Sequence, residues 1–423
     1  MPAAIPTSPR SAASPVAASS QTRPLLRGRV LVGAGILLLA FNLRTAVTAL
    51  PPVFDRVQTD LAMSVTVAGL VGTAPTAAFA VFAAAAPAVV RRLGLERTAW
   101  LAMAVAAAGH LLRAAAPGTA TFLLATVVAL AAMGVGNVVA PPLVKRYFGD
   151  RVGTVTGLYV LFISLGTALP AQLAVPLEAA GSWRLAVGAW AVLAVTAAVP
   201  WVVVWRREAR RAALERATSP AVAERVTWTR LAGSPVAWGL AVMMGTTSLG
   251  TYALLTWLPT IVVEAGVERA TAGTMLAVFA GLGMPLSLAV PPLAARMRNP
   301  APLVLLAVAA MLAGCAGMAS APLSWTWVWV VLLGLGGAPF PLALALINLR
   351  SSTQAGATGL SGFAQGVGYT IACAGPVVAG LLGEVTGSWT ATLGFLAVVL
   401  VITAVGGVVA CRPVTVEQSL ARR

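Results

Sequence analysis

Charged side chains are scarce in this chain. Asp, Glu, Lys and Arg make up 9% of its 423 residues, whereas an ordinary soluble domain carries about a quarter. Hydrophobic residues make up 59%, in long apolar runs that recur from residue 30 to residue 411. A helical run of about 20 apolar residues spans a bilayer core of about 30 Å. The sequence therefore excludes an ordinary soluble domain and predicts an all-α membrane protein with twelve transmembrane helices.

The chain is also poor in groups that perform chemistry. It has one histidine, and its three cysteines, Cys315, Cys373 and Cys411, lie far apart in apolar runs. Asp and Glu fall at the outer ends of the expected spans or in loops. Because an enzyme needs clustered acid, base or nucleophilic groups, we expect neither an enzyme nor a bound cofactor or metal. The buried carboxylate often used for proton coupling is missing, so the coupling ion stays open, with protons as one candidate.

Basic residues alternate between loops. The formal net charge is +16, and nearly all of the 28 Lys and Arg residues lie in every second loop or near the chain ends. Cytoplasmic loops carry such an excess, so we expect both termini in the cytoplasm and no nucleic-acid binding. The abundance of Arg over a single Lys favours a bacterial cytoplasmic membrane protein. The exceptions are Arg44, Arg56, Arg113, Arg184 and Arg269.

The longest polar connection divides the chain into two halves that resemble each other. Gly134-Val-Gly136 and Pro141 recur as Gly334-Leu-Gly336 and Pro341. Repeated halves commonly hold a transport site between them, although small residues also match by chance in packed membrane helices. We expect two pseudo-symmetric six-helix bundles. The predicted parts are a disordered cytoplasmic tail at 1–29, a bundle at 30–205, a central cytoplasmic loop at 206–236, a bundle at 237–411 and a cytoplasmic tail at 412–423.

Arg44 is the most informative polar residue. An arginine near the centre of a transmembrane helix costs at least about 2.5–3.5 kcal/mol. At 1.5 Å per residue, Arg44 lies about 21 Å along its helix from Val30. We expect it to bind the solute, and the alternative is that it snorkels outward or binds backbone carbonyls. Thr48 shares its helix face, whereas Asn42 is expected to bond a neighbouring helix.

Other spans carry polar residues that we expect in the same cavity. Tyr252 belongs to a row of hydroxyl side chains in the seventh span, and Gln365 and Tyr369 form a similar row in the eleventh. A buried amide such as Gln365 needs several partners. Asn137 precedes two consecutive prolines and could instead satisfy the carbonyls that they free. Ordinary interhelical hydrogen bonding is the alternative for all of these residues.

His110 is the only histidine and lies one turn from Arg113 in the third span. Imidazole titrates near neutrality, so a proton relay is one interpretation. The other is a solvated or hydrogen-bonded histidine at a helix end, which we favour.

Several motifs occur together in one family of membrane carriers. They are Phe41-Asn42-Leu43-Arg44 followed by Leu50-Pro51-Pro52, the segment from Arg91 to Arg97, Gly136-Asn137-Val-Val-Ala-Pro141 with Pro142-Leu143-Val144-Lys145-Arg146, Trp257-Leu258-Pro259, and Gln365-Gly-Val-Gly368-Tyr369 with Gly375-Pro376. In these motifs the chain resembles the major facilitator superfamily, and within it the family of cyanate permeases and 2-nitroimidazole transporters.

The resemblance implies a carrier whose two bundles rock about a site at the membrane midplane. Arg44 would supply positive potential, and amide and hydroxyl groups would orient the solute. The expected solute-binding residues are Arg44, Thr48, Asn137, Tyr252, Gln365 and Tyr369. The cytoplasmic gate residues are expected to be Arg91, Arg92, Gly94, Lys145 and Arg146.

Departures from the family pattern limit what the resemblance implies. Arg91 stands where the superfamily usually has Asp, which puts the usual gate ion pair in doubt, and Thr247 stands where the close family has Gln. We expect a monomeric secondary active transporter for a small polar or anionic solute, such as a cyanate-like anion or a small nitro or carboxylate compound. The alternative is a multidrug or toxic-compound efflux carrier of the same fold. The fifth span lacks the Gly-Pro-Gly-Gly pattern of proton-driven drug exporters, which disfavours that alternative.

Overall fold

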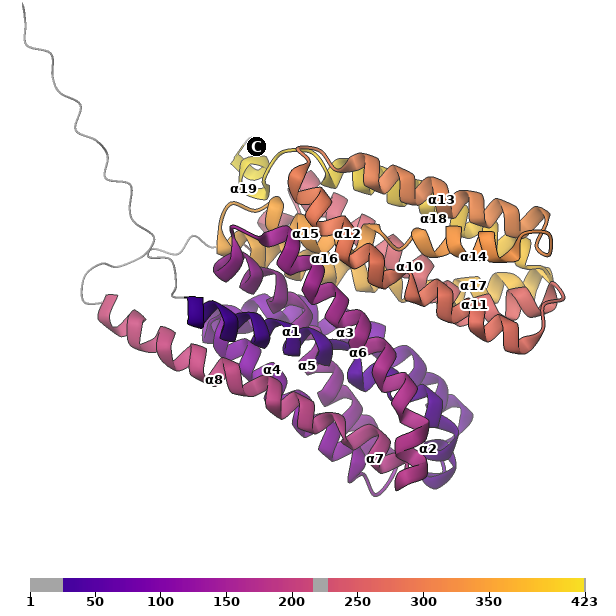
Figure 1. Cartoon of the computed structure of the whole chain (residues 1–423), viewed down its shortest axis with the longest axis horizontal. Coiled ribbons are helices and arrows are strands. Elements are labelled where there is room, and N and C mark those ends of the chain that lie inside the picture. Colours follow the sequence, from indigo (N-terminus) through magenta and orange to yellow (C-terminus); the bar gives the residue numbers. More distant parts are fainter. Residues whose placement is uncertain (1–25, 216–226, 422–423) are drawn as a thin grey trace, which may run out of the picture.

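The computed structural model describes residues 26–215 and 227–421, which are almost entirely helical. The helices form two lobes (Figure 1). The first lobe, called here the first bundle, contains α1 (Leu26–Thr48), η1 (Pro51–Val53), α2 (Phe54–Asp60), α3 (Val65–Leu93), α4 (Leu95–Ala114), α5 (Thr119–Phe148), α6 (Val152–Ala180), α7 (Trp183–Gly188) and α8 (Trp190–Glu215). The second bundle contains α9 (Trp228–Leu231), α10 (Pro235–Glu264), α11 (Arg269–Gly281), α12 (Gly283–Arg296), α13 (Ala301–Ser320), α14 (Thr326–Leu335), α15 (Pro339–Leu349), α16 (Gln354–Ala372), α17 (Ala374–Thr386), α18 (Trp389–Ala410) and α19 (Val416–Ala421).

Ten segments of the described chain are long and apolar enough to cross a membrane. Two further long helices, α4 and α10, pack among them: α4 lies against α5 and α8, and α10 lies against α16 and α18. With these two, the membrane-length segments number twelve, six in each bundle. The prediction of an all-α membrane protein with about twelve transmembrane helices is confirmed.

Several spans of the second bundle are broken near their middle. The break between α14 and α15 falls at Gly336, Gly337 and Ala338, and α15 begins at Pro339. The break between α16 and α17 falls at Cys373, just before Pro376. Proline has no backbone N–H and its ring clashes with the preceding turn. In each of these spans the regular helical hydrogen bonding is therefore interrupted at one point.

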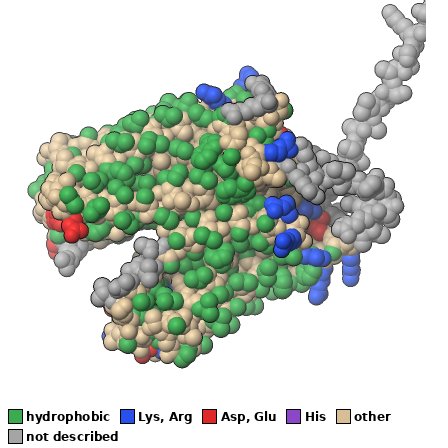
Figure 2. All heavy atoms as spheres, turned by 180° about the vertical axis from the view of Figure 1, so that it is seen from behind, with side chains coloured by type: hydrophobic (Ala, Val, Ile, Leu, Met, Phe, Trp, Pro, Cys, Tyr) green, Lys and Arg blue, Asp and Glu red, His purple; other side chains and the backbone are tan. Residues whose placement is uncertain are grey.

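Among the described residues, the main contacts between the two bundles lie toward one end. The interface is formed by α3 against α16 and by α6 against α12, with α5 and α15 beside them. Figure 1 shows the bundles diverging from this contact toward the ends of α11, α17, α2 and α7. In the space-filling view of Figure 2, the same separation is an open cleft.

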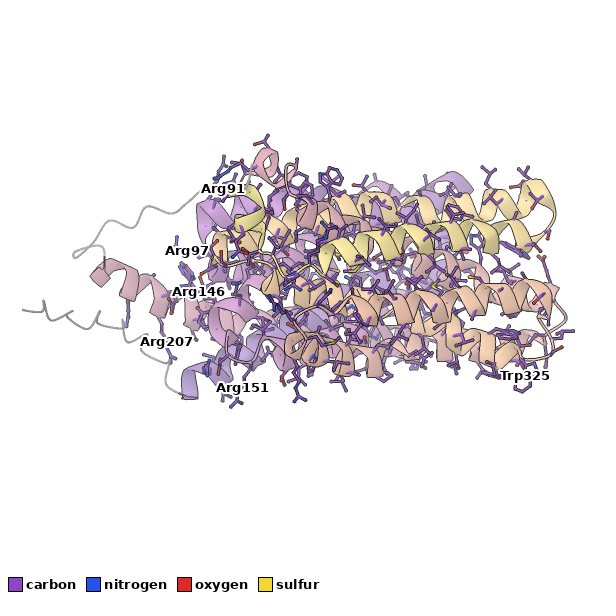
Figure 3. All side chains as sticks on the ribbon, turned by 90° about the horizontal axis from the view of Figure 1, so that it is seen from above. Arg91, Arg97, Arg146, Arg151, Arg207 and Trp325 are labelled. Carbon is purple, nitrogen blue, oxygen red and sulfur yellow. The ribbon has the colours of Figure 1, made fainter. Side chains whose placement is uncertain are left out.

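Basic side chains mark the closed end of the molecule. Arg91, Arg97, Arg146, Arg151 and Arg207 lie at one end, and Trp325 lies at the other (Figure 3). Figure 2 shows Lys and Arg side chains gathered at the end opposite the cleft opening. We call these the basic end and the open end of the molecule.

Glycines allow the bundles to approach backbone to backbone at the basic end. A methyl group added at Gly157 of α6 would lie 2.9 Å from the carbonyl oxygen of Ser287 in α12, and one at Gly366 of α16 would lie 3.3 Å from Cα of Ala84 in α3. Larger side chains at these positions would collide with the other bundle. The interface is thus sealed by close helix packing, as is typical of membrane helices with small residues.

The structure describes only parts of the expected tails and central loop. Residues 1–25 of the expected N-terminal tail, 216–226 of the central loop and 422–423 of the C-terminal tail lie outside the described residues. Within the central loop, α8 continues to Glu215 and the short helix α9 precedes α10. In the C-terminal segment, α19 folds back against α10 and α16.

Candidate functional site

Arg44 lies in α1 where the two bundles meet. Its side chain is 8% exposed. Nη1 donates to the carbonyl oxygen of Leu43 at 2.9 Å and to Oδ1 of Asn137 in α5 at 3.4 Å, and Nη2 donates to the hydroxyl of Tyr369 in α16 at 3.2 Å. The alternative that Arg44 snorkels outward is wrong, because its guanidinium points toward the second bundle. The alternative that it binds a backbone carbonyl is borne out by the bond to Leu43, beside the bonds to side chains.

An aromatic pair holds the guanidinium in place. The Cζ atom of Arg44 lies 5.1 Å from the ring centroid of Phe79 in α3, a cation–π distance. The rings of Phe79 and Tyr369 are 5.3 Å apart. Phe79 was not expected in the site, since one phenylalanine in an apolar helix carries no distinguishing pattern. It covers one face of the guanidinium and leaves the edges of the group to other partners.

Two consecutive prolines create hydrogen-bond acceptors beside this cluster. Pro141 and Pro142 lack the N–H groups that would bond the carbonyl oxygens of Asn137 and Val138 in α5. Nε2 of Gln365 donates to the Asn137 oxygen and Oγ of Ser361 donates to the Val138 oxygen, both at 2.9 Å. The expectation that the Asn137 side chain satisfies these carbonyls is wrong, because the partners come from α16 in the other bundle.

The other two expected site residues lie nearby with different roles. The hydroxyl of Thr48 is 3.1 Å from the carbonyl oxygen of Arg44 and 3.3 Å from that of Gly166 in α6, so it joins helices of the first bundle. Tyr252 of α10 is half-buried and close enough to Arg44 and Tyr369 to interact with them electrostatically. Arg44, Asn137, Gln365 and Tyr369 thus form one hydrogen-bonded cluster, with Tyr252 beside it.

The charge of Arg44 has no carboxylate beside it. In the described parts of the chain, every ion pair joins residues of the first bundle near its ends, and none includes Arg44. The polar groups that contact Arg44 are an amide, a phenol hydroxyl and a backbone carbonyl. The cluster therefore keeps a net positive charge and suits an anionic or polarised ligand.

The expected gate residues differ in their contacts. Arg91 and Arg92 are exposed and form no ion pair within the described residues, and Gly94 has φ of +84° where α3 turns into α4. Lys145 spans the two bundles: Nζ donates to the carbonyl oxygen of Asn348 at 2.8 Å, to the Ser351 hydroxyl at 3.1 Å and to the Ser351 carbonyl oxygen.

Arg146 stays within the first bundle. It pairs with Glu96 at 3.2 Å and with Glu208 at 2.9 Å, and Tyr147 donates to Glu96 at 2.9 Å. Of the five expected gate residues, Lys145 is the one with hydrogen bonds to the second bundle in the described structure.

His110 and Arg113 are fully buried behind α1. Nδ1 of His110 is 2.9 Å from the carbonyl oxygen of Val187, and Nε2 is 3.1 Å from the Thr45 hydroxyl. Since a carbonyl only accepts, the Nδ1 atom carries a proton. His110 is therefore hydrogen-bonded but not solvated.

The expectation that Asn42 bonds a neighbouring helix is wrong, because its amide donates to the carbonyl oxygen of Leu38 in its own helix at 2.8 Å.

Comparison with known proteins identifies relatives along nearly the whole chain. The sequence model of the Major Facilitator Superfamily matches residues 33–373. The chain is 31% identical over 393 residues to the uncharacterized transporter YycB of Bacillus subtilis (strain 168), covering 92% of this chain and 95% of that protein.

Two further relatives come from Escherichia coli (strain K12). The 2-nitroimidazole transporter is 30% identical, with 91% of this chain and 96% of that protein covered. The cyanate transport protein CynX is 28% identical, with 86% and 93% covered.

Solved structures share the fold at low sequence identity. The proton:xylose symporter XylE bound to 6-bromo-6-deoxy-D-glucose matches with a TM-score of 0.66 and 10% identity, over 93% of this chain and 98% of that one. The transporter FucP in the outward conformation matches with a TM-score of 0.67 and 16% identity, over 90% and 99%. These likenesses concern the fold alone.

Proposed function

This chain belongs to the Major Facilitator Superfamily, and from that premise we propose that it carries a small anionic or polar solute across the membrane by alternating access. The family and the relatives establish that the chain is a membrane transporter for small solutes and not an enzyme. The observation that carries the finer proposal is Arg44, a buried cation held by Phe79, Asn137 and Tyr369 without a carboxylate beside it. A buried cation in a membrane protein is costly and marks a solute or ion pathway.

The position of Arg44 supports a site at the inner limit of the cleft. Gly366 packs against α3 on the basic side, whereas Tyr369 lies about 5 Å further along α16 at 1.5 Å per residue. The bundles diverge from their contact toward the open end (Figures 1 and 2). A solute entering the cleft from the open end meets Arg44 where the bundles first touch.

We assign the basic end to the cytoplasm, as the positive-inside rule requires. The conformation described is then open to the outside and closed to the cytoplasm. To open inward, the transporter must break the bonds of Lys145 to Ser351 and Asn348, and those of Gln365 and Ser361 to α5. These groups, with the glycine contacts around Gly157, constitute the proposed cytoplasmic gate.

The names of two relatives bear on the class of solute. Relatives named for 2-nitroimidazole and cyanate favour a cyanate-like anion or a small nitro or carboxylate compound. We propose a monomer in the bacterial cytoplasmic membrane, with both termini in the cytoplasm and with protons as the coupling ion to test first.

Counterflow in proteoliposomes tests the proposal. Vesicles loaded in turn with unlabelled cyanate, nitrate, formate or 2-nitroimidazole are diluted into the labelled compound, and wild type is compared with Arg44→Ala. We expect counterflow of small anions that falls by at least about tenfold in Arg44→Ala, since a charge-assisted bond contributes about 1.5–3 kcal/mol. A pH gradient applied across the same vesicles tests proton coupling.

Arg56→Ala is the matched control, because Arg56 is an exposed arginine paired with Glu178 away from the cluster. Its counterflow should equal that of wild type. Transport of bulky cations, unaffected by Arg44→Ala and without small-anion counterflow, would overturn the proposal and favour the efflux carrier.

A further inference from the structure

We infer that the preferred solute is a small planar oxyanion with two adjacent acceptor oxygens, such as a carboxylate or nitrate, over linear anions such as cyanate or thiocyanate. This inference rests on the proposed function and adds the shape of the ligand. It follows from the hydrogen-bond donors that the central cluster leaves unused.

Arg44 keeps two of its N–H donors unused among the described residues. The group has five N–H donors in a fixed fork. Both donors of Nη1 are used by Leu43 and Asn137, and one donor of Nη2 is used by Tyr369. Among the described residues, the Nε–H and one N–H of Nη2 have no acceptor. Nε and Nη2 form one side of the fork, which matches two oxygens of one planar anion.

The amide of Asn137, which contacts Arg44 at Nη1, adds a second kind of unused donor to the cluster. Its Oδ1 accepts from Arg44, which fixes the orientation of the amide. Its Nδ2 is buried and has no hydrogen-bond partner in the described structure, and the residue is 4% exposed. A buried donor without an acceptor costs about 1–3 kcal/mol. Because the atom is covered, a solute oxygen would satisfy it after a small movement of the side chains around it.

Tyr369 supplies a third donor. Because an arginine can only donate, the hydroxyl oxygen of Tyr369 accepts the bond from Arg44 and its own proton is left over. The three side chains therefore face the site with donors. Their combined preference is for a ligand that is rich in acceptors and negatively charged.

One face of the guanidinium is covered. Phe79 lies over it at 5.1 Å, and the unused N–H donors point outward in the plane of the group, where we expect the ligand to bind. A carboxylate or nitrate offers two oxygens to such an edge, whereas the end of a linear anion offers one atom. The bidentate geometry is thus the source of the expected selectivity.

Competition in the counterflow assay tests the inference. Unlabelled nitrate, formate, cyanate and thiocyanate compete with whichever labelled anion wild type carries. We expect nitrate and formate to compete at concentrations at least about tenfold lower than the linear anions, as one extra charge-assisted bond would give. In Arg44→Lys, which keeps the charge but lacks the fork, this preference should shrink to about threefold or less.

Tyr369→Phe provides a second variant that removes one donor and keeps the ring packed on Phe79. It should weaken competition by nitrate and formate more than competition by thiocyanate. Thr196→Val, which removes an exposed hydroxyl bonded within α8, is the control and should leave the series unchanged.

The outcomes separate this inference from the proposed function. If small anions are carried with dependence on Arg44 but linear and planar anions compete equally, the shape inference is overturned and the anion carrier stands. If no small anion is carried, both fall. The wild-type series decides the matter even if Arg44→Lys is not recovered as a folded protein.

Discussion

The side-chain amide of Gln365 in the second bundle donates to the backbone carbonyl oxygen of Asn137 in the first, at 2.9 Å. That oxygen is available because Pro141, four residues later, has no N–H to bond it. A proline in one bundle thus creates the acceptor by which the other bundle is held. The bond belongs to the conformation that is closed at the basic end and must break when that end opens.

Removing the donor of this bond, or occupying its acceptor, should weaken closure of the basic end. Gln365→Met should shift the equilibrium toward cytoplasmic opening by about fivefold, since a neutral hydrogen bond contributes about 0.5–1.5 kcal/mol. Pro141→Ala should act in the same direction, because a backbone N–H at that position competes for the Asn137 oxygen. The measurement is the spin-label distance between Gly149→Cys and Arg296→Cys, placed at the basic end in a chain without its native cysteines.

The double variant decides whether the two residues act through one bond. In a double-mutant cycle, the combined effect of Gln365→Met and Pro141→Ala should be smaller than the sum of the two single effects. Full additivity would show that Pro141 does not act by exposing this carbonyl.

Lys145 should make a larger contribution to closure. Its ammonium binds carbonyl oxygens at the end of α15, where helix carbonyls lack intrahelical donors and the helix dipole is negative. In Lys145→Met, we expect the same spin-label pair to show at least about tenfold more of the cytoplasm-open population, from charge-assisted bonds of about 1.5–3 kcal/mol.

Arg151→Met is the control for Lys145→Met. Arg151 is an exposed basic residue at the same end, and its recorded ion pair is with its neighbour Asp150. Equal distance distributions for Lys145→Met and Arg151→Met would mean that the contact between Lys145 and the second bundle does not hold the gate.

We expect Arg113 to lower the stability of the fold and to support solute binding. Its Nη1 donates to the carbonyl oxygen of Ala46 at 2.8 Å, two residues from Arg44. The guanidinium lies 5.2 Å from the ring centroid of Phe122, and its Nε and Nη2 are buried without hydrogen-bond partners in the described structure. Because burying unpaired donors is costly, Arg113→Met should melt in detergent at the wild-type temperature or above it. The apparent KM for the solute should rise several-fold, since the end of α1 that carries Arg44 loses an anchor.

The exposed Arg184 gives the comparison for Arg113. It pairs with Asp60 at 2.6 Å, and exposed pairs contribute only about 0–1 kcal/mol, so Arg184→Met should change neither melting nor KM. A lower melting temperature with unchanged KM in Arg113→Met would assign Arg113 a purely structural role.

Glu417 predicts a pH dependence at the basic end. Burial raises the pKa of this carboxyl, but hydrogen bonds from the backbone N–H groups of Ser352 and Thr353 outweigh burial and hold the pKa below its ordinary value of 4.5. A lowered pKa stabilises the folded state above the unfolded pKa, and this stabilisation is lost as the pH falls through the folded value.

The melting temperature of wild type should therefore exceed that of Glu417→Gln by a constant amount from pH 8 to about pH 5.5. The difference should disappear below the lowered pKa. A difference that vanished already between pH 7 and pH 6 would contradict the proposed pairing, because that range lies above the ordinary pKa of the carboxyl.

The fold could be predicted because hydropathy and the placement of charge determine it directly. Polar residues inside apolar runs also stand out, so Arg44, Asn137, Gln365 and Tyr369 could be identified before their contacts were known. The hydrogen bonds between them could not be predicted, because Gln365 is 228 residues from Asn137 and either residue could bond other helices. Phe79 was missed because its role comes from its position alone.

A repeated tripeptide marks the same position in the two halves of the sequence. Gly181-Ser182-Trp183 recurs as Gly387-Ser388-Trp389 at the outer corners of the two bundles. Trp183 donates to Asp60 at 2.9 Å, and Trp389 donates to Glu264 at 2.7 Å. The repeated motif thus makes equivalent bonds in each half, which adds to the support for two related bundles.

The basic end is held shut by contacts to backbone atoms, through the glycines of α6 and α16 and through Lys145, whereas the ion pairs between described residues stay inside the first bundle. Pairs of exposed charges weaken as salt accumulates, because the Debye length shrinks from about 10 Å at 0.1 M to about 3 Å at 1 M. Packed backbones do not respond in this way. Salt that accumulates in the cell during osmotic stress would therefore weaken closure of the basic end through Lys145, whose bonds to the end of α15 involve a charge, and not through the packed backbones.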